Sequence, residues 1–370
     1  MKGRLGSLIA AAVTLFAVIG LAACGSDDKT SSSTGGGKAE GKTIALLLPE
    51  TKTTRYEAHD RPEFEAQVKR DCPSCKVIYA NATQDPQKQQ TQAESALTDG
   101  ADVLALDAVD VKSATGIVQK ANQQNVPVIA YDRLIPNSDL YAYVSFNNVR
   151  QGQIQAQTLV DKLGPGAKGK SIIMINGAPT DPSAGDYKKG AHSVLDRSGL
   201  KIAKEYDTSD WSPDKAQREM EQAITAVGKN GFVGVYSAND GMAGGAIAAM
   251  KGQGIKPSTR PTTGQDAEVA GLQRILTGDQ LMTVYQPIKK IASTAAELAV
   301  DLVNGKRADA DKLATAKVNN GKKDVPSVLL DTVVVTKDNI KSTVIADGFV
   351  KASQICTGPY EADCKAAGIS

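Results

Sequence analysis

The chain has 370 residues, with 43 Lys and Arg against 41 Asp and Glu, so its formal net charge is +2 at pH 7. A charge so close to zero argues against a nucleic-acid partner, because such partners select basic surfaces. The length from Lys42 onward is sufficient for two domains of ordinary size.

Residues 1–23 have the composition of a secretory signal. Lys2 and Arg4 give a positive start, a short apolar stretch follows, and Leu-Ala-Ala stands directly before Cys24. This order is typical of a signal peptide, and its last four residues resemble the lipidation and cleavage pattern of bacterial lipoproteins. An ordinary signal peptide with a chance Cys is the alternative. We therefore expect an extracytoplasmic protein that a lipid on Cys24 anchors to the cell membrane.

Residues 24–41 contain Gly, Ser, Thr, Asp and Lys but no large apolar side chain. Such a segment has nothing to bury, so we expect a flexible linker. It would hold the folded body about 20–25 Å from the lipid.

Two series of short apolar runs follow, separated by stretches of helical pattern. The expected strands are residues 43–48, 76–80, 103–106 and 128–131 in the first series, and 171–175, 201–205, 232–236 and 281–285 in the second. Continuous apolar runs are typical of strands that are buried on both faces. Their alternation with helices indicates parallel sheets wound in right-handed crossovers. The sequence therefore predicts an α/β protein of two Rossmann-like lobes around a central cleft.

Local signals also predict where two helices begin or end. Asp85 offers a capping side chain, and Pro86 suits the first helical position. A second helix is expected over 147–163, where Gly164-Pro165-Gly166 stops it.

Polar side chains stand just after the predicted strands, where open α/β sheets bind ligands. These residues include Arg55, Arg61, Asp132, Arg133, Asp181, Asn239, Gln265 and Asp266. Trp211, the only Trp of the chain, lies in a polar loop. Purely structural roles are the alternative: Asp132 and Arg133 would form an ion pair, and Asn239 would cap a helix.

These residue types suit a sugar. Asp, Asn and Arg bind adjacent hydroxyl groups through two hydrogen bonds at once, and charge-assisted bonds are the stronger ones. An aromatic plane such as Trp211 covers a ring face and excludes water. Because no Ser-His-Asp set or phosphate-binding loop is evident, we expect no enzyme activity.

Four cysteines besides Cys24 suggest two disulfides in an exported chain. Their order along the chain favours Cys72 with Cys75 and Cys356 with Cys364, although three pairings are possible. A redox or metal role for Cys72 and Cys75 is the alternative. The chain has only 2 His, and we expect neither a metal site nor a cofactor.

Six short motifs occur in order along the chain: 130–135 (AYDRLI), 144–148 (VSFNN), 237–240 (SAND), 244–246 (GGA), 264–267 (GQDA) and 282–285 (MTVY). Together they resemble the periplasmic D-xylose-binding proteins of ABC transporters. Residues 49–55 (PETKTTR) are more similar to the related multi-sugar binding proteins that partner a membrane sensor kinase. The resemblance extends from about residue 43 to about residue 349.

The resemblance implies the periplasmic binding protein type I fold, with a three-segment hinge near 144–147, 285–288 and 319–324. The N-terminal lobe would comprise 42–145 and 287–320, and the C-terminal lobe 146–286 and 321–349. Residues 350–370 form a tail beyond the resemblance.

The resemblance also implies sugar contacts at Arg61, Asp132, Arg133, Asn239 and Asp266, with Trp211 as a looser match. Two departures bear on ligand choice. Gln286 stands where the family usually has Lys, and the loop that contains Asp181 has Pro182 and Ser183 in place of Asn. We include Gln286 and Asp181 among the expected ligand-binding residues.

The expected mechanism is hinge closure of a monomer around a monosaccharide, most favourably D-xylose, followed by recognition by the permease subunits of an ABC importer. The alternative is a sugar-sensing receptor that presents a different sugar or sugar derivative to a membrane sensor.

Overall fold

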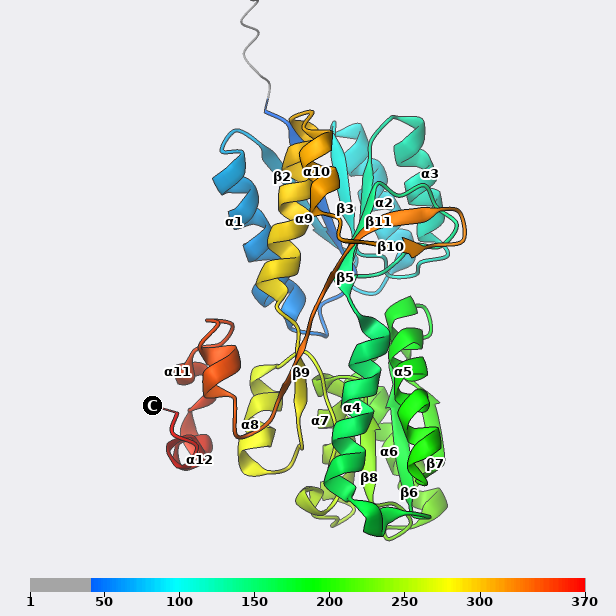
Figure 1. The fold of residues 1–370 in the computed structure, drawn as a ribbon, viewed down its shortest axis with the longest axis vertical. Coiled ribbons are helices and arrows are strands. Elements are labelled where there is room, and N and C mark those ends of the chain that lie inside the picture. The colour runs from blue at the N-terminus through cyan, green and yellow to red at the C-terminus, as the bar shows by residue number, and fades with distance from the viewer. Residues whose placement is uncertain (1–40, 370) are drawn as a thin grey trace, which may run out of the picture. The chain divides into compact units, whose positions relative to one another are not determined.

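The computed structural model describes residues 41–369, which form two α/β lobes joined by three chain crossings (Figure 1). The predicted signal peptide, the predicted lipidation site Cys24 and all but the end of the predicted linker lie outside the described residues. Across 41–369, no helix combines the length and the apolar character that a bilayer crossing requires.

The N-terminal lobe is built on a seven-stranded sheet in the order β10-β11-β5-β4-β3-β1-β2. All neighbouring pairs are parallel except β10 with β11. The strands are β1 (Thr43–Leu48), β2 (Lys76–Asn81), β3 (Val103–Leu106), β4 (Val128–Tyr131), β5 (Ala142–Phe146), β10 (Ala316–Asn319) and β11 (Asp324–Leu330). The helices are α1 (Arg61–Asp71), α2 (Pro86–Thr98), α3 (Ala114–Gln123), α9 (Ile288–Val303) and α10 (Arg307–Leu313).

Strand β1 shows why this sheet is buried on both faces. Leu46 belongs to the core that contains Phe64 of α1 and Ile291 of α9, whereas Leu47 belongs to the core that contains Leu97 of α2. Successive strand residues point to opposite faces, so an uninterrupted apolar run serves both cores. The predicted parallel α/β architecture is confirmed.

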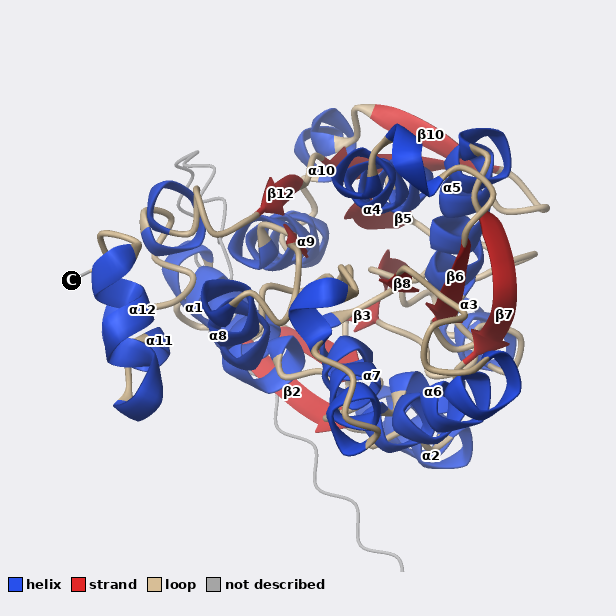
Figure 2. Ribbon diagram, turned by 90° about the horizontal axis from the view of Figure 1, so that it is seen from below, coloured by secondary structure: helices blue, strands red, loops and turns tan. Residues whose placement is uncertain are grey.

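The C-terminal lobe has a parallel three-stranded sheet in the order β7-β6-β8 and an antiparallel pair of β12 with β9. Its strands are β6 (Ser171–Asn176), β7 (Lys201–Asp207), β8 (Gly234–Ser237), β9 (Thr283–Tyr285) and β12 (Val333–Val335). Its helices are α4 (Asn148–Leu163), α5 (Pro182–Ser198), α6 (Pro213–Val227), α7 (Asp240–Gly252) and α8 (Val269–Thr277). Helices α4 and α5 lie on one side of the parallel sheet, and α6 and α7 lie on the other (Figure 2).

The predicted helix signals act as expected. The Asp85 side chain accepts hydrogen bonds from the backbone N–H groups of Gln87 and Lys88 at the start of α2. Asn147 caps α4 in the same way through Arg150, and α4 ends where Gly164 takes a φ of 65°. Capping side chains satisfy backbone donors that lack a partner within the helix.

The lobes are joined between β5 and α4, between β9 and α9, and between β11 and β12 (Figure 1). The prediction for the third crossing is wrong. We placed it near 319–324, but β11 (Asp324–Leu330) pairs with β5 in the N-terminal sheet. The crossing therefore lies between Leu330 and Val333, and residues 321–330 belong to the N-terminal lobe.

The structure contains both disulfides that sequence order favours, Cys72–Cys75 and Cys356–Cys364. The second one holds together the tail helices α11 (Ala352–Ile355) and α12 (Glu361–Ala366), which lie beside α8 (Figures 1 and 2). Ile355 of α11 is fully buried in the same core as Leu272 of α8. The tail is therefore packed on the C-terminal lobe.

Candidate ligand-binding site

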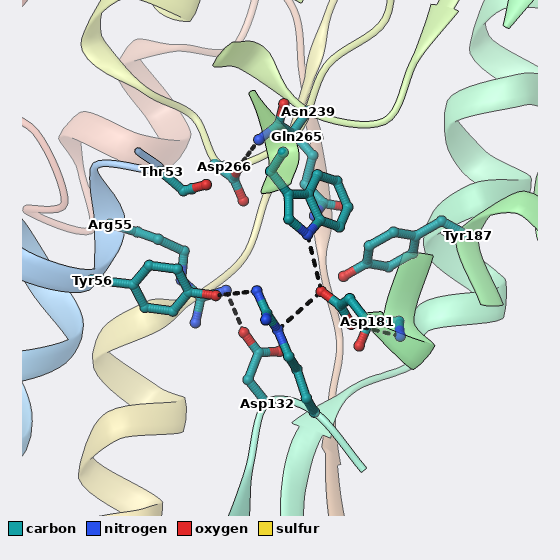
Figure 3. Close-up of a pocket in the computed structure, with 12 residues that line it drawn as sticks. Thr53, Arg55, Tyr56, Asp132, Asp181, Tyr187, Asn239, Gln265 and Asp266 are labelled. Atoms are coloured by element: carbon teal, nitrogen blue, oxygen red, sulfur yellow. Dashed lines mark hydrogen bonds and ion pairs between the residues drawn. The ribbon is translucent and has the colours of Figure 1, made fainter. Parts of the chain in front are cut away.

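A polar cavity lies between the two lobes, at the carboxyl ends of their strands (Figure 3). We call it the cleft cavity and define it by its lining: Thr53, Arg55, Tyr56, Asp132, Arg133, Asp181, Ser183, Tyr187, Trp211, Asn239, Gln265 and Asp266. Most of these side chains are polar or charged. The space is therefore suited to a small polar ligand.

Arg55, from the segment between β1 and α1, is the central cation of one wall. Its guanidinium lies 2.8 Å from a carboxylate oxygen of Asp132 and 2.8 Å and 2.9 Å from the two oxygens of Asp60. Its Nη1 also donates to Oε1 of Gln286 at 3.2 Å. All these side chains are buried. The pairing of one Arg with two Asp fixes its planar group beside the cavity.

Arg133 follows Asp132 at the end of β4 and provides the second cation. Its Nε lies 2.9 Å from Asp181 of the C-terminal lobe and 3.3 Å from Asp107 of its own lobe. Its Nη1 donates to the Ala108 carbonyl at 2.9 Å, and its Nη2 donates to the Tyr56 hydroxyl at 3.3 Å. Arg133 therefore contacts groups from both lobes.

Asp266 and Gln265 supply hydrogen-bond acceptors from the C-terminal lobe. Asp266 is 5% exposed and accepts one hydrogen bond, from Nδ2 of Asn239 at 3.3 Å. Gln265 is 4% exposed, and its Oε1 has no hydrogen-bond partner within 41–369. Burial raises the pKa of Asp266 well above its ordinary value, although the charge of Arg55 opposes this rise. These acceptors suit a ligand that brings its own donors.

Aromatic rings cover another side of the cavity. Trp211 and Tyr187 meet edge to face, with ring centroids 6.4 Å apart and an interplanar angle of 68°. The indole Nε1 donates to Oδ2 of Asp181 at 3.2 Å, which fixes the orientation of the ring (Figure 3). Such rings offer a rigid apolar surface to the face of a ligand.

Three lining residues have left-handed backbone conformations: Asp132 (φ 62°), Trp211 (φ 53°) and Asp266 (φ 91°). This conformation is unfavourable for side chains other than Gly, and a bulky residue such as Trp rarely adopts it. Strain of this kind is concentrated at functional sites. Three residues with left-handed backbone conformations therefore lie at the same cavity as the buried charges.

Gly177 leaves the space that the Trp211 ring occupies, because a Cβ at this position would overlap the six-membered ring. We expect Gly177→Ala to displace Trp211, with about 1–3 kcal/mol of overpacking strain, and to weaken ligand binding. Trp fluorescence reports this directly, since the chain has 1 Trp. Gly185→Ala on α5 is the matched control, because a Cβ there meets nothing within 4 Å. An unchanged emission spectrum and affinity in Gly177→Ala would contradict the expectation.

The cleft cavity brings together six of the eight predicted ligand-binding residues: Asp132, Arg133, Asp181, Trp211, Asn239 and Asp266. Arg61 is not among them. Its side chain is 42% exposed, pairs with Glu65 at 3.0 Å and lies over the Tyr79 ring at 4.0 Å. Arg55 lines the cavity instead, and the structure places Arg61 outside it.

Gln286 is the other predicted residue that does not line the cavity. It is 1% exposed, and it accepts from Arg55 and donates to Oε1 of Gln151 at 3.2 Å. It stands at the second crossing between the lobes, directly after β9. Gln286 therefore contacts Arg55 and not the cavity itself.

Six lining residues were not assigned to the site from the sequence: Thr53, Arg55, Tyr56, Ser183, Tyr187 and Gln265. Arg55 and Gln265 follow strand ends, so the same rule that selected Asp132 covers them. Tyr187 lies in the second turn of α5, and nothing local in the sequence distinguishes it from a core residue.

Within residues 41–369, no three His, Cys, Asp or Glu side chains are arranged to hold a metal ion. The cavity instead combines two guanidinium groups, carboxylates, amides and aromatic rings. Donors and acceptors of this kind match hydroxyl groups, which both donate and accept. A polar cavity between two lobes that are joined by a hinge defines a receptor that encloses a small polar solute.

Comparisons with known proteins agree with this class. The family model described as "Periplasmic binding protein domain" matches residues 44–307. The D-xylose-binding periplasmic protein of Escherichia coli (strain K12) is 38% identical over 316 residues, which cover 84% of this chain and 92% of the relative. The multiple sugar-binding periplasmic receptor ChvE of Rhizobium radiobacter is 32% identical, with 86% and 93% covered.

Among solved structures, an ABC transporter solute-binding protein from Clostridium phytofermentans with bound β-D-glucose has a TM-score of 0.78 at 26% identity. The alignment covers 85% of this chain and 100% of that one. The chain therefore belongs to the family of D-xylose-binding periplasmic proteins and has the periplasmic binding protein type I fold. Proteins of this family are solute receptors, so the prediction that the chain is not an enzyme is confirmed.

Proposed function

We propose that this protein captures a monosaccharide, D-xylose first among the candidates, in the cleft cavity and delivers it to an ABC importer. The proposal rests on how hydrogen-bond donors and acceptors are distributed between the two lobes. Arg55 and Arg133 donate from the N-terminal lobe, and Asp266 and Gln265 accept from the C-terminal lobe. A sugar bound between them engages both walls at once, which favours the closed arrangement of the lobes.

The choice of D-xylose rests on the E. coli relative and on a second D-xylose-binding periplasmic protein, from Haemophilus influenzae, which is 38% identical over 310 residues. The residues that line the cleft cavity are compatible with several neutral sugars, because hydroxyl pairs of different sugars present the same donors and acceptors. The class of ligand therefore has broader support than the particular sugar.

Calorimetric titration of residues 25–370 with D-xylose, D-glucose, D-galactose, L-arabinose and D-ribose tests this function. We expect heat of binding from D-xylose and a ranking among the other sugars. If none of the five sugars binds, the proposal is wrong for neutral monosaccharides, and derivatives become the next candidates.

A sensing role is the second candidate. Residues 49–55 resemble the multi-sugar receptors, and this segment carries the lining residues Thr53 and Arg55. The similarity to a protein named a multiple sugar-binding receptor supports the same reading. Neighbouring genes for a permease and an ATPase would favour import, and a neighbouring gene for a sensor kinase would favour sensing.

We also propose that the mature chain is held at the membrane by a lipid on Cys24, on the strength of the residues before it. Cys24→Ser should release the protein from the membrane fraction, because one Cys carries the whole anchor. Fractionation of cells that express either form measures this. Equal membrane retention of both forms would contradict the anchor. Cys72→Ser, which breaks the Cys72–Cys75 disulfide and leaves Cys24 in place, is the control for loss of a cysteine elsewhere.

A further inference from the structure

An ion pair joins the two lobes on one side of the cleft cavity. Nε of Arg133 lies 2.9 Å from Oδ2 of Asp181, and their side chains are 3% and 5% exposed. Arg133 follows β4 of the N-terminal lobe, whereas Asp181 precedes α5 of the C-terminal lobe. This buried ion pair therefore exists only when the lobes are close together.

The carboxylate of Asp181 is already engaged by its own lobe. Oδ1 accepts from the backbone N–H of Ser183 at 2.8 Å, and Oδ2 accepts from the Trp211 indole at 3.2 Å. Arg133 adds an ion pair to these two donors, although its Nε has no hydrogen-bond partner within 41–369, and the two donors hold the carboxylate toward Arg133. Asp266, which has one protein donor, is the contrasting case.

Neighbouring residues reinforce this connection. The Asp210 carbonyl, beside Trp211, accepts from Nε2 of Gln84 in the N-terminal lobe at 3.3 Å. The Thr180 carbonyl, beside Asp181, is 3.5 Å from the backbone N of Val111 in the N-terminal lobe. The Trp211–Asp181 hydrogen bond ties these two C-terminal loops together, so they meet the N-terminal lobe as a unit.

Both members of the ion pair keep partners when the lobes separate. Arg133 retains Asp107 at 3.3 Å and the Ala108 carbonyl, and Asp181 retains Ser183 and Trp211. A buried charge that loses its only partner is strongly destabilising. Because neither charge here is left alone, the bond can form and break reversibly.

We propose that Asp181 is a latch between the lobes, a positioning residue that stabilises the closed form through Arg133, rather than a sugar contact. The proposal rests on the proposed function, because closure is how the sugar is enclosed. Asp181 thus contributes to closure that does not depend on which sugar is bound. Thr54 and Glu268 form a separate connection between the lobes, so loss of the latch shifts the balance toward the open form without removing all contact.

Asp181→Asn tests the latch in the mature chain. Asn retains an oxygen that can cap α5 at Ser183 but removes the charge that Arg133 pairs with. Without sugar, we expect a larger radius of gyration than in the wild type, measured by small-angle X-ray scattering. With sugar, we expect dissociation at least about fivefold faster, the lower end of typical coupling between states, with an unchanged ranking of sugars.

Asp210→Asn is the matched control, because Asp210 pairs with Lys215 inside the C-terminal lobe and is 42% exposed. We expect it to behave as the wild type in both measurements. Asp181→Ser, which also retains a capping group, guards against an effect peculiar to Asn, and thermal melts verify that each variant folds.

An unchanged radius and dissociation rate in Asp181→Asn and Asp181→Ser would overturn the latch. A changed ranking of sugars with an unchanged Trp fluorescence spectrum would also overturn it, because it would make Asp181 a ligand contact and not a support of the Trp211 ring. The scattering comparison needs no sugar, so its outcome is separate from that of the proposed function. If the wild type binds none of the sugars and Asp181→Asn still opens, the latch stands and the proposed function fails.

Discussion

Arg55→Met should lower the free energy of unfolding by about 3–5 kcal/mol, the usual result of removing one member of a buried ion pair. The Arg55 side chain is 4% exposed and neutralises both Asp60 and Asp132, which are 0% and 7% exposed. Met has a similar length but leaves two buried carboxylates without their cation. Denaturation by urea, followed by circular dichroism, measures the loss.

Arg61→Met is the matched control. Arg61 is 42% exposed and pairs with Glu65, which is 38% exposed. Exposed pairs of this kind contribute about 0–1 kcal/mol, so the control should stay close to the wild type. Equal losses in the two variants would contradict the central place of Arg55.

The stability of Arg55→Met should depend on pH in a defined direction. Burial already raises the pKa of Asp132 in the folded protein, and without the opposing charge of Arg55 this pKa rises further. The folded state consequently binds more protons than the unfolded state above the ordinary Asp pKa, so its stability falls as the pH rises. The deficit of Arg55→Met relative to the wild type should therefore shrink at acidic pH.

The contrast between Arg55 and Arg61 also shows where the sequence was insufficient. Both follow β1, and the strand-end rule does not choose between them. Arg61 is the first residue of α1 and lies four residues from both Glu57 and Glu65, the spacing of surface pairs on a helix. That spacing indicates that Arg61 lies on the helix surface, and it therefore favours Arg55 as the inward-facing residue.

The prediction for the third crossing is wrong for a related reason. The predicted crossing at 319–324 contains Asn320-Gly321, which belongs to the four-residue loop 320–323 of a hairpin between β10 and β11, with Gly321 at a φ of 90°. Asn-Gly is a strong hairpin signal between strands. The residues of β11 are apolar enough for either lobe, and only pairing with β5 decides which lobe receives them.

The strand-end rule succeeded where the chain is most regular. Asp132, Asn239 and Asp266 each follow a strand end or a strand-like segment, and all three line the cleft cavity. Ligand sites at such edges follow from the parallel direction of the strands. Tyr187 shows the limit of the rule, because the face of a helix that meets a cavity depends on how the two lobes pack.

Asp266→Ala should weaken sugar binding by about 1.5–3 kcal/mol, the range for losing hydrogen bonds to a charged group, which is roughly 10- to 150-fold in Kd. Stability should not fall with it. Burial raises the pKa of Asp266, so the ionised carboxylate is unfavourable in the folded protein and its removal costs little. Titration calorimetry and urea denaturation measure the two effects. Asp279→Ala, which removes an ion pair with Lys251 outside the cavity, is the control.

Asp266 should also couple sugar binding to protons. Sugar hydroxyls that donate to the carboxylate favour its ionised form, so binding lowers its pKa from the raised value. Between the two pKa values, binding then releases a proton, and affinity rises with pH. Calorimetry in two buffers of different ionisation enthalpy counts the protons, and Asp266→Asn should reduce the count.

Proton release that is unchanged in Asp266→Asn would assign the coupling to another group, and a flat pH profile would mean that no coupling exists. Either outcome, together with retained affinity in Asp266→Ala, would remove Asp266 from the sugar site.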